Sequence, residues 1–263
     1  MKEKLRTPAA PANKAVLLTG AAGFIGSRVA RSLAGRDDVT LISVDARGHF
    51  RSRKEHRGIA FGEIVGRDEL MDWLRDTRPR LAAILHLGAC SNTLETDAAY
   101  LTKMNVEYSQ RLWTYAAEHG VPFVYASSAA TYGAGEHGYD DAEENIPLLR
   151  PLNPYGESKQ AFDRWALEQD EAGRRPPAWS GFKFFNVYGF GERHKGRMAS
   201  VALHAYDQVK SRGYVELFRS HKEGIADGEQ KRDFVYVDDV VAVLHYAWET
   251  PLGRGIYNLG SGR

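Results

Sequence analysis

The sequence predicts an α/β protein built on a doubly wound parallel sheet. Short apolar runs alternate with helical patterns, a glycine-rich turn joins the first apolar run to the first helical pattern, and no internal repeat interrupts this order. At 263 residues the chain can bury a full core as one large domain or as a domain with an added lobe. The Rossmann arrangement, with helices on both faces of the sheet, fits all three observations.

Each element follows from its local pattern. Apolar runs predict strands at 15–19, 39–44, 81–87, 123–126, 182–188 and 233–237, with an apparent last strand leading into the stretch 257–263. Apolar residues at helical spacing predict helices at 24–33, 69–74, 98–118, 155–171, 198–209 and 240–248. A glycine-rich loop at 189–196 and a polar stretch at 220–230 interrupt the later elements.

Composition and rhythm divide the chain into three parts. Residues 1–13 mix Lys, Arg, Pro and Ala without an apolar core region, which predicts a disordered leader and not a signal peptide. Residues 14–180 carry the regular alternation, and we expect them to form a dinucleotide-binding Rossmann domain. Residues 181–263 lose that rhythm, so we expect them to mix a smaller substrate lobe with the last elements of the main sheet.

Composition and charge exclude several classes of protein. A hydrophobic content of 43% and a charged content of 26% are ordinary for a soluble globular protein. A net charge of +1 without a basic stripe gives no case for nucleic-acid binding, and no apolar stretch is long enough to span a bilayer. The lone Cys90 excludes an internal disulfide and a cysteine-based zinc site, so we expect no metal centre and a cytoplasmic location.

The turn after the first predicted strand is suited to a dinucleotide. Gly20, Gly23 and Gly26 permit a tight turn, the close approach of a pyrophosphate and tight packing of the helix on the sheet. Asp45 ends the second predicted strand, where its carboxylate would accept ribose hydroxyls or simply cap the turn. Asp45 favours NAD, whereas the nearby Arg51 could bind the 2′-phosphate of NADP, as could Arg47 and Arg53, so the local residues leave the cofactor open.

A Tyr–Lys pair and a serine provide candidate chemistry. Tyr155 and Lys159 lie four residues apart, on one face of a helix. An ammonium beside a phenol lowers the phenol pKa from about 10 toward neutrality, so Tyr155 could exchange a proton with a substrate hydroxyl. Ser128 follows a predicted central strand, at the sheet edge where ligands bind, and could hydrogen-bond the same hydroxyl. A serine in this position could also do no more than satisfy a turn.

Together these pieces resemble the extended short-chain dehydrogenase/reductase family, of the NAD-dependent epimerase/dehydratase type, from about Ala15 onward. The resemblance implies that Ser128, Tyr155 and Lys159 form the catalytic group and that Asn105 supports it. The cofactor-binding residues that it implies are Gly20, Gly23, Phe24, Ile25, Gly26, Asp45, Ala46, Arg51, Leu87, Gly88, Ala89, Cys90, Ser91, Asn105, Lys159 and Val187.

Longer stretches resemble one subgroup, the ADP-L-glycero-D-manno-heptose 6-epimerases, and the run His194-Lys-Gly-Arg-Met-Ala-Ser is the most specific of them. These enzymes make the heptose precursor of the lipopolysaccharide inner core. The resemblance implies transient oxidation of the sugar by bound NADP, with inversion at one carbon. One residue cannot reach both faces of that carbon, so Lys195 would join Tyr155 as a second acid/base group. Taken alone, Lys195 would be a solvated loop lysine.

The same resemblance implies an ADP-heptose substrate and a homo-oligomer, with pentamers common in the subgroup. The substrate-binding positions that it implies are Asn186, Arg197, His204, Ser220 and Arg232. Arg197 and His204 are seven residues apart, two helical turns along one face, so both could point at one ligand.

Three departures limit the resemblance. The family continues several dozen residues past Arg263, so part of the substrate lobe is expected to be missing. Glu63 and Ile64, expected in a turn that opens a helix, replace an aspartate that commonly touches the adenine. Residues 219–230 form a longer insert than some members carry.

Two other functions stay open. A UDP-hexose 4-epimerase needs one tyrosine and no second base at Lys195, and a non-catalytic cofactor-binding protein would keep the fold but usually loses the Tyr or the Lys. A 4,6-dehydratase is disfavoured because Ala129 and Ala130 stand where that group places an Asp-Glu pair.

Overall fold

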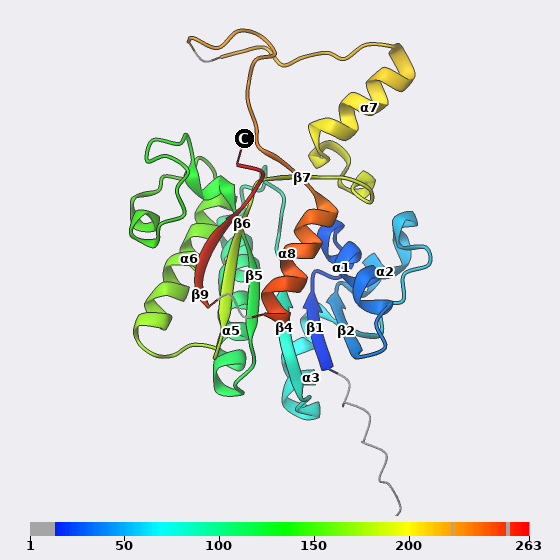
Figure 1. Cartoon of the computed structure of the whole chain (residues 1–263), viewed down its shortest axis with the longest axis vertical. Coiled ribbons are helices and arrows are strands. Elements are labelled where there is room, and N and C mark those ends of the chain that lie inside the picture. The colour runs from blue at the N-terminus through cyan, green and yellow to red at the C-terminus, as the bar shows by residue number, and fades with distance from the viewer. Residues whose placement is uncertain (1–13, 222, 251–252, 263) are drawn as a thin grey trace, which may run out of the picture.

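The computed structural model describes residues 14–221, 223–250 and 253–262, so the leader predicted at 1–13 lies outside the described residues. Its centre is a seven-stranded parallel sheet in the order β3-β2-β1-β4-β5-β6-β9, which confirms the predicted fold class (Figure 1). The strands are β1 (Lys14–Thr19), β2 (Val39–Asp45), β3 (Glu63–Gly66), β4 (Leu81–His86), β5 (Phe123–Ser128), β6 (Trp179–Phe184) and β9 (Arg254–Leu259).

Helices cover both faces of this sheet. The helices that pack around the sheet are α1 (Phe24–Ala34), α2 (Arg47–Ser52), α3 (Leu70–Thr77), α4 (Ala98–Leu101), α5 (Tyr108–Glu118), α6 (Pro154–Glu171) and α8 (Val237–Glu249), whereas α7 (Val201–Arg212) projects beyond it (Figure 1). Side chains alternate across a strand, so Leu17 of β1 packs with α3, α5 and α6, whereas its neighbours Val16 and Leu18 pack with α1 and α8. Among the described residues, no helix has the length and apolar character needed to cross a membrane.

The long helix predicted at 98–118 contains a π-helical stretch. It begins as α4, continues through the π-helical η3 (Thr102–Glu107) and ends as α5. Asn105 lies inside η3 and is buried. Because π-helical turns occur often at functional sites, this stretch indicates that a functional site lies near Asn105.

Two sequence-based assignments are wrong. The strand predicted at 182–188 is two strands: β6 belongs to the main sheet, and β7 (Asn186–Tyr188) pairs with β8 (Phe234–Tyr236) in a separate two-stranded sheet. An apolar run cannot show that its two halves pair with different partners. Glu63 and Ile64, expected in a turn, lie in the edge strand β3, whose exposed first half hides the apolar pattern of a strand.

The last third of the chain contributes to both the sheet and a projecting arm. Helix α8 packs on α1, and β9 completes the sheet beside β6. Helix α7 and residues 213–221 extend away from the sheet at the end where the strands finish (Figure 1). The carboxyl edge of the sheet and the base of this arm therefore lie at the same end of the molecule.

Candidate functional site

The glycine turn lies at the carboxyl end of β1. Gly20 has a φ of 67°, and a Cβ atom on it would lie 2.7 Å from the backbone nitrogen of Gly88. A Cβ on Gly26 would collide with the carbonyl oxygen of Gly20. Helix α1 starts directly after this turn, and its N-cap residue, Gly23, has no side chain to cover the first N–H groups. The uncovered N–H groups at the start of α1 thus form a cradle that suits a dinucleotide pyrophosphate, and the glycines at 20 and 26 let the turn pack closely against Gly88 and the helix.

The Asp45 carboxylate ties the end of β2 to the glycine turn. It accepts hydrogen bonds from the backbone nitrogens of Ala22, at 3.1 Å, and Ala46, at 2.7 Å. The Nδ1 atom of His49 lies 2.9 Å from the same carboxylate. Asp45 therefore caps this turn, and its predicted contact with a ribose remains a prediction.

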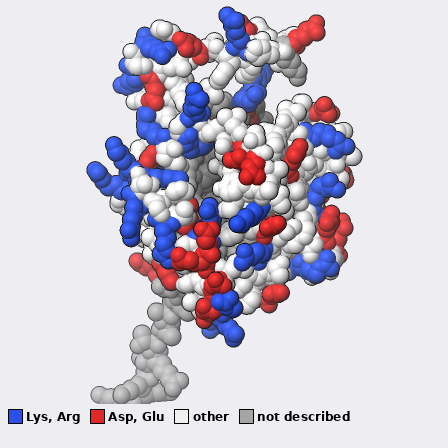
Figure 2. Space-filling view, turned by 180° about the vertical axis from the view of Figure 1, so that it is seen from behind, with Lys and Arg blue, Asp and Glu red and all other residues white. Residues whose placement is uncertain are grey.

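A basic flank borders the glycine turn. Lys and Arg side chains gather over α2 and the short helix η1 (Lys54–His56), seen from behind in Figure 2. Arg47 is paired with Glu69, at 2.6 Å, whereas the Arg53 guanidinium donates to the carbonyl of Ala22 inside the turn. Arg51 is exposed on α2. Of the three arginines, Arg53 thus contacts the glycine turn directly, and Arg51 is exposed on the helix that follows Asp45.

Asn105 holds the loop after β4. Its side-chain oxygen accepts from the backbone nitrogen of Cys90, at 2.8 Å, and its amide donates to the carbonyl of Cys90 and to Ser158. Gly88, in the same loop, donates its backbone N–H to Thr19. Asn105 therefore joins three neighbouring parts of the site: the loop after β4, the π-helical stretch and the helix α6.

Tyr155 and Lys159 are buried near the start of α6. Asn153 caps this helix through a hydrogen bond with Gly156, at 2.8 Å, and Pro154 occupies its first turn. The Lys159 ammonium donates to the carbonyl of Ala126, at 3.0 Å, and burial lowers its pKa to about 8. The α6 helix thus delivers both side chains to the carboxyl end of β5.

The sequence-based expectation for the pKa of Tyr155 is wrong for this structure. Burial raises that pKa above its ordinary value, and a hydrogen bond with Ser128 opposes the rise. The ammonium of Lys159 is bonded to a backbone carbonyl and does not outweigh the loss of water around the phenol. The hydrogen bond from Ser128 is consequently the interaction in this structure that favours the phenolate form of Tyr155.

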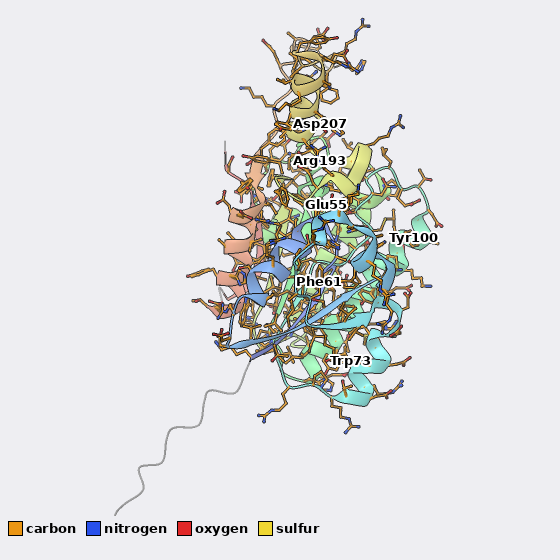
Figure 3. All side chains as sticks on the ribbon, turned by 90° about the vertical axis from the view of Figure 1, so that its right-hand side faces the viewer. Glu55, Phe61, Trp73, Tyr100, Arg193 and Asp207 are labelled. Carbon is orange, nitrogen blue, oxygen red and sulfur yellow. The ribbon has the colours of Figure 1, made fainter. Side chains whose placement is uncertain are left out.

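Lys195 lies on the short helix η6 (Arg193–Met198), within a loop that returns toward the glycine turn. Its ammonium stands 5.3 Å from the centre of the Phe24 ring, and burial lowers its pKa. The backbone nitrogen of His194 donates to Glu55, at 3.0 Å, which docks the loop on η1; Figure 3 labels Glu55 beside Arg193. Lys195 is thus a partly buried lysine beside the first turn of α1, and not the solvated one that its loop suggested.

The Glu192 carboxylate closes this loop. It is 2% exposed and accepts from the backbone nitrogens of Gly189, at 3.2 Å, and Ser200, at 2.6 Å, and from the Ser200 hydroxyl, at 2.7 Å. The backbone nitrogen of Lys195 donates to the carbonyl of Glu192. Both ends of the segment that carries Lys195 are therefore fixed by one side chain, which the sequence analysis did not single out.

The five predicted substrate residues lie on different parts of the described chain. Asn186 donates to the carbonyl of Asp233, Ser220 lies in the arm, and Arg232 donates to the carbonyl of its neighbour Lys231. The shared helical face predicted for Arg197 and His204 is wrong. Arg197 belongs to η6, and the chain leaves the helical conformation before α7 begins with Val201.

Sequence reasoning also missed a buried ion pair behind the site, Asp163 and Lys183. Both side chains are fully buried, and Asp163 lies one helical turn beyond Lys159. That spacing, together with a lysine inside the apolar run Phe182-Lys-Phe, was the signal that could have revealed the pair.

Comparison with known proteins places this geometry in a family. Residues 16–260 match the model of the NAD dependent epimerase/dehydratase family. The chain is 44% identical to the ADP-L-glycero-D-manno-heptose-6-epimerase of Fusobacterium nucleatum, over 94% of this chain and 75% of that protein. The solved structure of the corresponding Helicobacter pylori enzyme matches with a TM-score of 0.76 and 27% identity, over 95% of this chain and 78% of that one. The structure of MoeE5 in complex with UDP-glucose and NAD matches with a TM-score of 0.69 and 29% identity, over 94% and 76%.

Proposed function

Because the chain belongs to the NAD dependent epimerase/dehydratase family, we propose that it converts ADP-D-glycero-D-manno-heptose into ADP-L-glycero-D-manno-heptose by inverting C6. The product would serve the synthesis of the lipopolysaccharide inner core. The support is the 44% identity to a relative of that name together with the position of Lys195. A one-base epimerase has no use for a partly buried lysine beside the glycine turn.

The family uses a nicotinamide cofactor, and the cradle at Gly20–Gly26 fits its pyrophosphate. We propose NADP as the cofactor of this chain. Arg53 contacts the turn, Arg51 is exposed on α2 just after the end of β2, and either guanidinium suits a 2′-phosphate. Asp45, whose charge would oppose that phosphate, is already occupied by the backbone of the turn and by His49.

Inversion at C6 requires two proton-transfer groups, one on each face of the carbon. When bound, the cofactor supplies a reversible acceptor for hydride. Tyr155, assisted by Ser128, exchanges a proton with the C6 hydroxyl in one configuration, and Lys195 does so in the other. Burial lowers the pKa of Lys195, which favours the neutral amine that a base requires. The sugar ends with an inverted C6 and no net oxidation, since the proton and the hydride both return.

The test is direct. The purified protein is incubated with ADP-D-glycero-D-manno-heptose, and the configuration at C6 is followed by NMR, with UDP-glucose as the parallel substrate. We expect inversion of the heptose without turnover of UDP-glucose. Turnover of UDP-glucose alone would replace the proposal with a 4-epimerase, and turnover of neither would leave a cofactor-binding protein.

We also propose that the chain forms a homo-oligomer. This rests on the resemblance of the chain to the ADP-L-glycero-D-manno-heptose 6-epimerases. Light scattering of the purified protein measures the assembly directly, and a monomer at micromolar concentration would contradict the proposal.

A further inference from the structure

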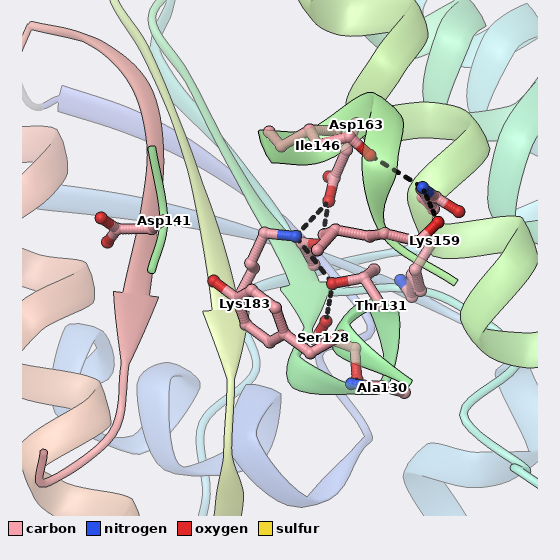
Figure 4. A network of polar contacts seen from close by, with 12 residues as sticks. Ser128, Ala130, Thr131, Asp141, Ile146, Lys159, Asp163 and Lys183 are labelled. Carbon is pink, nitrogen blue, oxygen red and sulfur yellow. Dashed lines mark hydrogen bonds and ion pairs between the residues drawn. The ribbon is translucent and has the colours of Figure 1, made fainter. Parts of the chain in front are cut away.

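Behind the Ser128–Tyr155 site lies a buried polar network that has no contact with solvent. Its centre is the pair formed by Asp163 of α6 and Lys183 of β6, with the Nζ and Oδ2 atoms 3.5 Å apart and both side chains 0% exposed (Figure 4). Replacing such a pair with apolar side chains of similar volume is often neutral or stabilising. The presence of this charged pair in the core therefore indicates a role other than stability.

Asp163 has its oxygens fully engaged. Its Oδ1 atom accepts from the Tyr125 hydroxyl, at 3.0 Å, and its Oδ2 atom accepts from the Ser127 hydroxyl, at 2.6 Å. Both donors belong to β5, the strand that ends in Ser128. The carboxylate thus holds the end of β5 through these two hydroxyls while it pairs with the Lys183 ammonium at 3.5 Å.

Lys183 imposes a direction on the next hydrogen bonds. Its ammonium donates to the Thr131 hydroxyl oxygen, at 2.7 Å, and the Thr131 hydroxyl lies 2.9 Å from the carbonyl oxygen of Ser128. An ammonium can only donate. The lone pair of Thr131 must therefore face Lys183, and its single proton must point to the Ser128 carbonyl.

The end of β5 is thus held at three successive residues. Lys159 binds the carbonyl of Ala126, Asp163 binds the hydroxyl of Ser127, and Thr131 binds the carbonyl of Ser128. The first turn of α6 also packs closely here, because a Cβ on Gly156 would lie 2.8 Å from the carbonyl of Ala130. The turn after Ser128 consequently fixes how the serine meets Tyr155.

We propose that Lys183, acting through Thr131 and balanced by Asp163, is a positioning residue that holds Ser128 in hydrogen-bonding reach of Tyr155. The proposal rests on the proposed function in one respect: Ser128 and Tyr155 share the substrate hydroxyl. The geometric claim itself stands on the structure of the protein alone.

The first test uses Thr131, because its substitution leaves the ion pair in place. Thr131→Val keeps the shape and removes the hydroxyl, whereas the control Thr131→Ser keeps the hydroxyl. We expect kcat to fall about tenfold in Thr131→Val, with KM within about twofold, and to stay near the wild-type value in Thr131→Ser. A folded Thr131→Val protein with the wild-type kcat would overturn the proposal.

A second measurement does not depend on turnover. Tyrosine is labelled with ¹³C at Cζ, and the Tyr155 resonance is assigned with Tyr155→Phe. The shift of this resonance reports the hydrogen bond of the Tyr155 hydroxyl. It should move in Thr131→Val and in Lys183→Met but stay in place in Thr131→Ser and Lys183→Arg. An unmoved resonance in folded Thr131→Val contradicts the positioning role. If the Tyr155 resonance shifts in the variants but the wild-type protein does not invert the heptose, the positioning role is supported and the proposed function is contradicted.

Discussion

The two proposed acid/base groups stand on very different supports. Tyr155 lies in the first turn of α6, a helix of 18 residues with an Asn cap, and the buried Asp163–Lys183 pair lies behind it. Lys195 lies on η6, none of whose residues is buried, next to Gly196 in the left-handed region. The contacts that fix the Lys195 loop are those of Glu192 and Glu55 and the packing on Phe24.

This difference indicates how the site divides its tasks. The Tyr155 side is part of the core and cannot change without disturbing the sheet. The Lys195 side is attached to the sheet edge by a few polar contacts, and segments of that kind open at low cost. The Tyr155 side is therefore expected to stay rigid, and the Lys195 loop to move more easily.

The largest expected effect separates activity from stability. Tyr155→Phe and Lys195→Ala should each lower kcat for heptose inversion by about 10²- to 10⁴-fold, because each removes one proton-transfer group. Both variants should keep the cofactor bound. Thermal unfolding should leave Lys195→Ala close to the wild-type melting temperature, since the side chain is only partly buried. Inversion by Lys195→Ala at the wild-type rate would end the two-base account.

The next effect concerns the pH dependence of stability. The pKa of Lys159 is about 8 in the folded protein and 10.5 in its ordinary state, so the unfolded chain binds more protons between these values. The free energy of unfolding should rise with pH from about 8 to 10.5, by about 3 kcal/mol from this group. Urea unfolding of wild type and Lys159→Met at pH 7 and pH 11 measures it. The difference in the free energy of unfolding between the two proteins must change with pH; a constant difference would show that folding does not lower the pKa of Lys159.

A smaller effect is expected at the loop. Glu192→Gln removes one of the carboxylate oxygens that accept from Gly189 and Ser200, so the Lys195 segment should loosen. We expect kcat to fall about tenfold, with cofactor affinity unchanged. Glu157→Gln, the same change at an exposed position of α6, is the matched control and should have the wild-type kcat. Equal behaviour of the two variants would show that Glu192 does not position Lys195.

Local patterns explain which parts of the fold could be predicted. The glycine turn and the Tyr155–Lys159 pair each lie within a short stretch of sequence, and the alternation of strands and helices predicted the parallel sheet. The split of 182–188 could not be seen, because it depends on Asn186 meeting Asp233, 47 positions away. β3 was missed since half of its short length is exposed.

The side chains that hold the site in place could not be predicted either, because their partners are distant in the sequence or meet only after folding. Lys183 meets Asp163 only after β6 pairs with β5, and Glu192 finds Ser200 only after the loop folds back. The expected fall in the pKa of Tyr155 was wrong because spacing along a helix says nothing of burial. Contacts between side chains that meet only when the strands and loops have packed cannot be predicted from a single sequence.

One measurement tests the central claim, that C6 is inverted by transient oxidation with two proton-transfer groups. Wild-type protein is incubated with ADP-D-glycero-D-manno-heptose in D₂O, and the product is examined by NMR at C6. The account predicts an inverted C6 that keeps its original hydrogen, because that hydrogen leaves and returns as hydride without meeting solvent. Deuterium at C6 would show removal as a proton and would contradict the account.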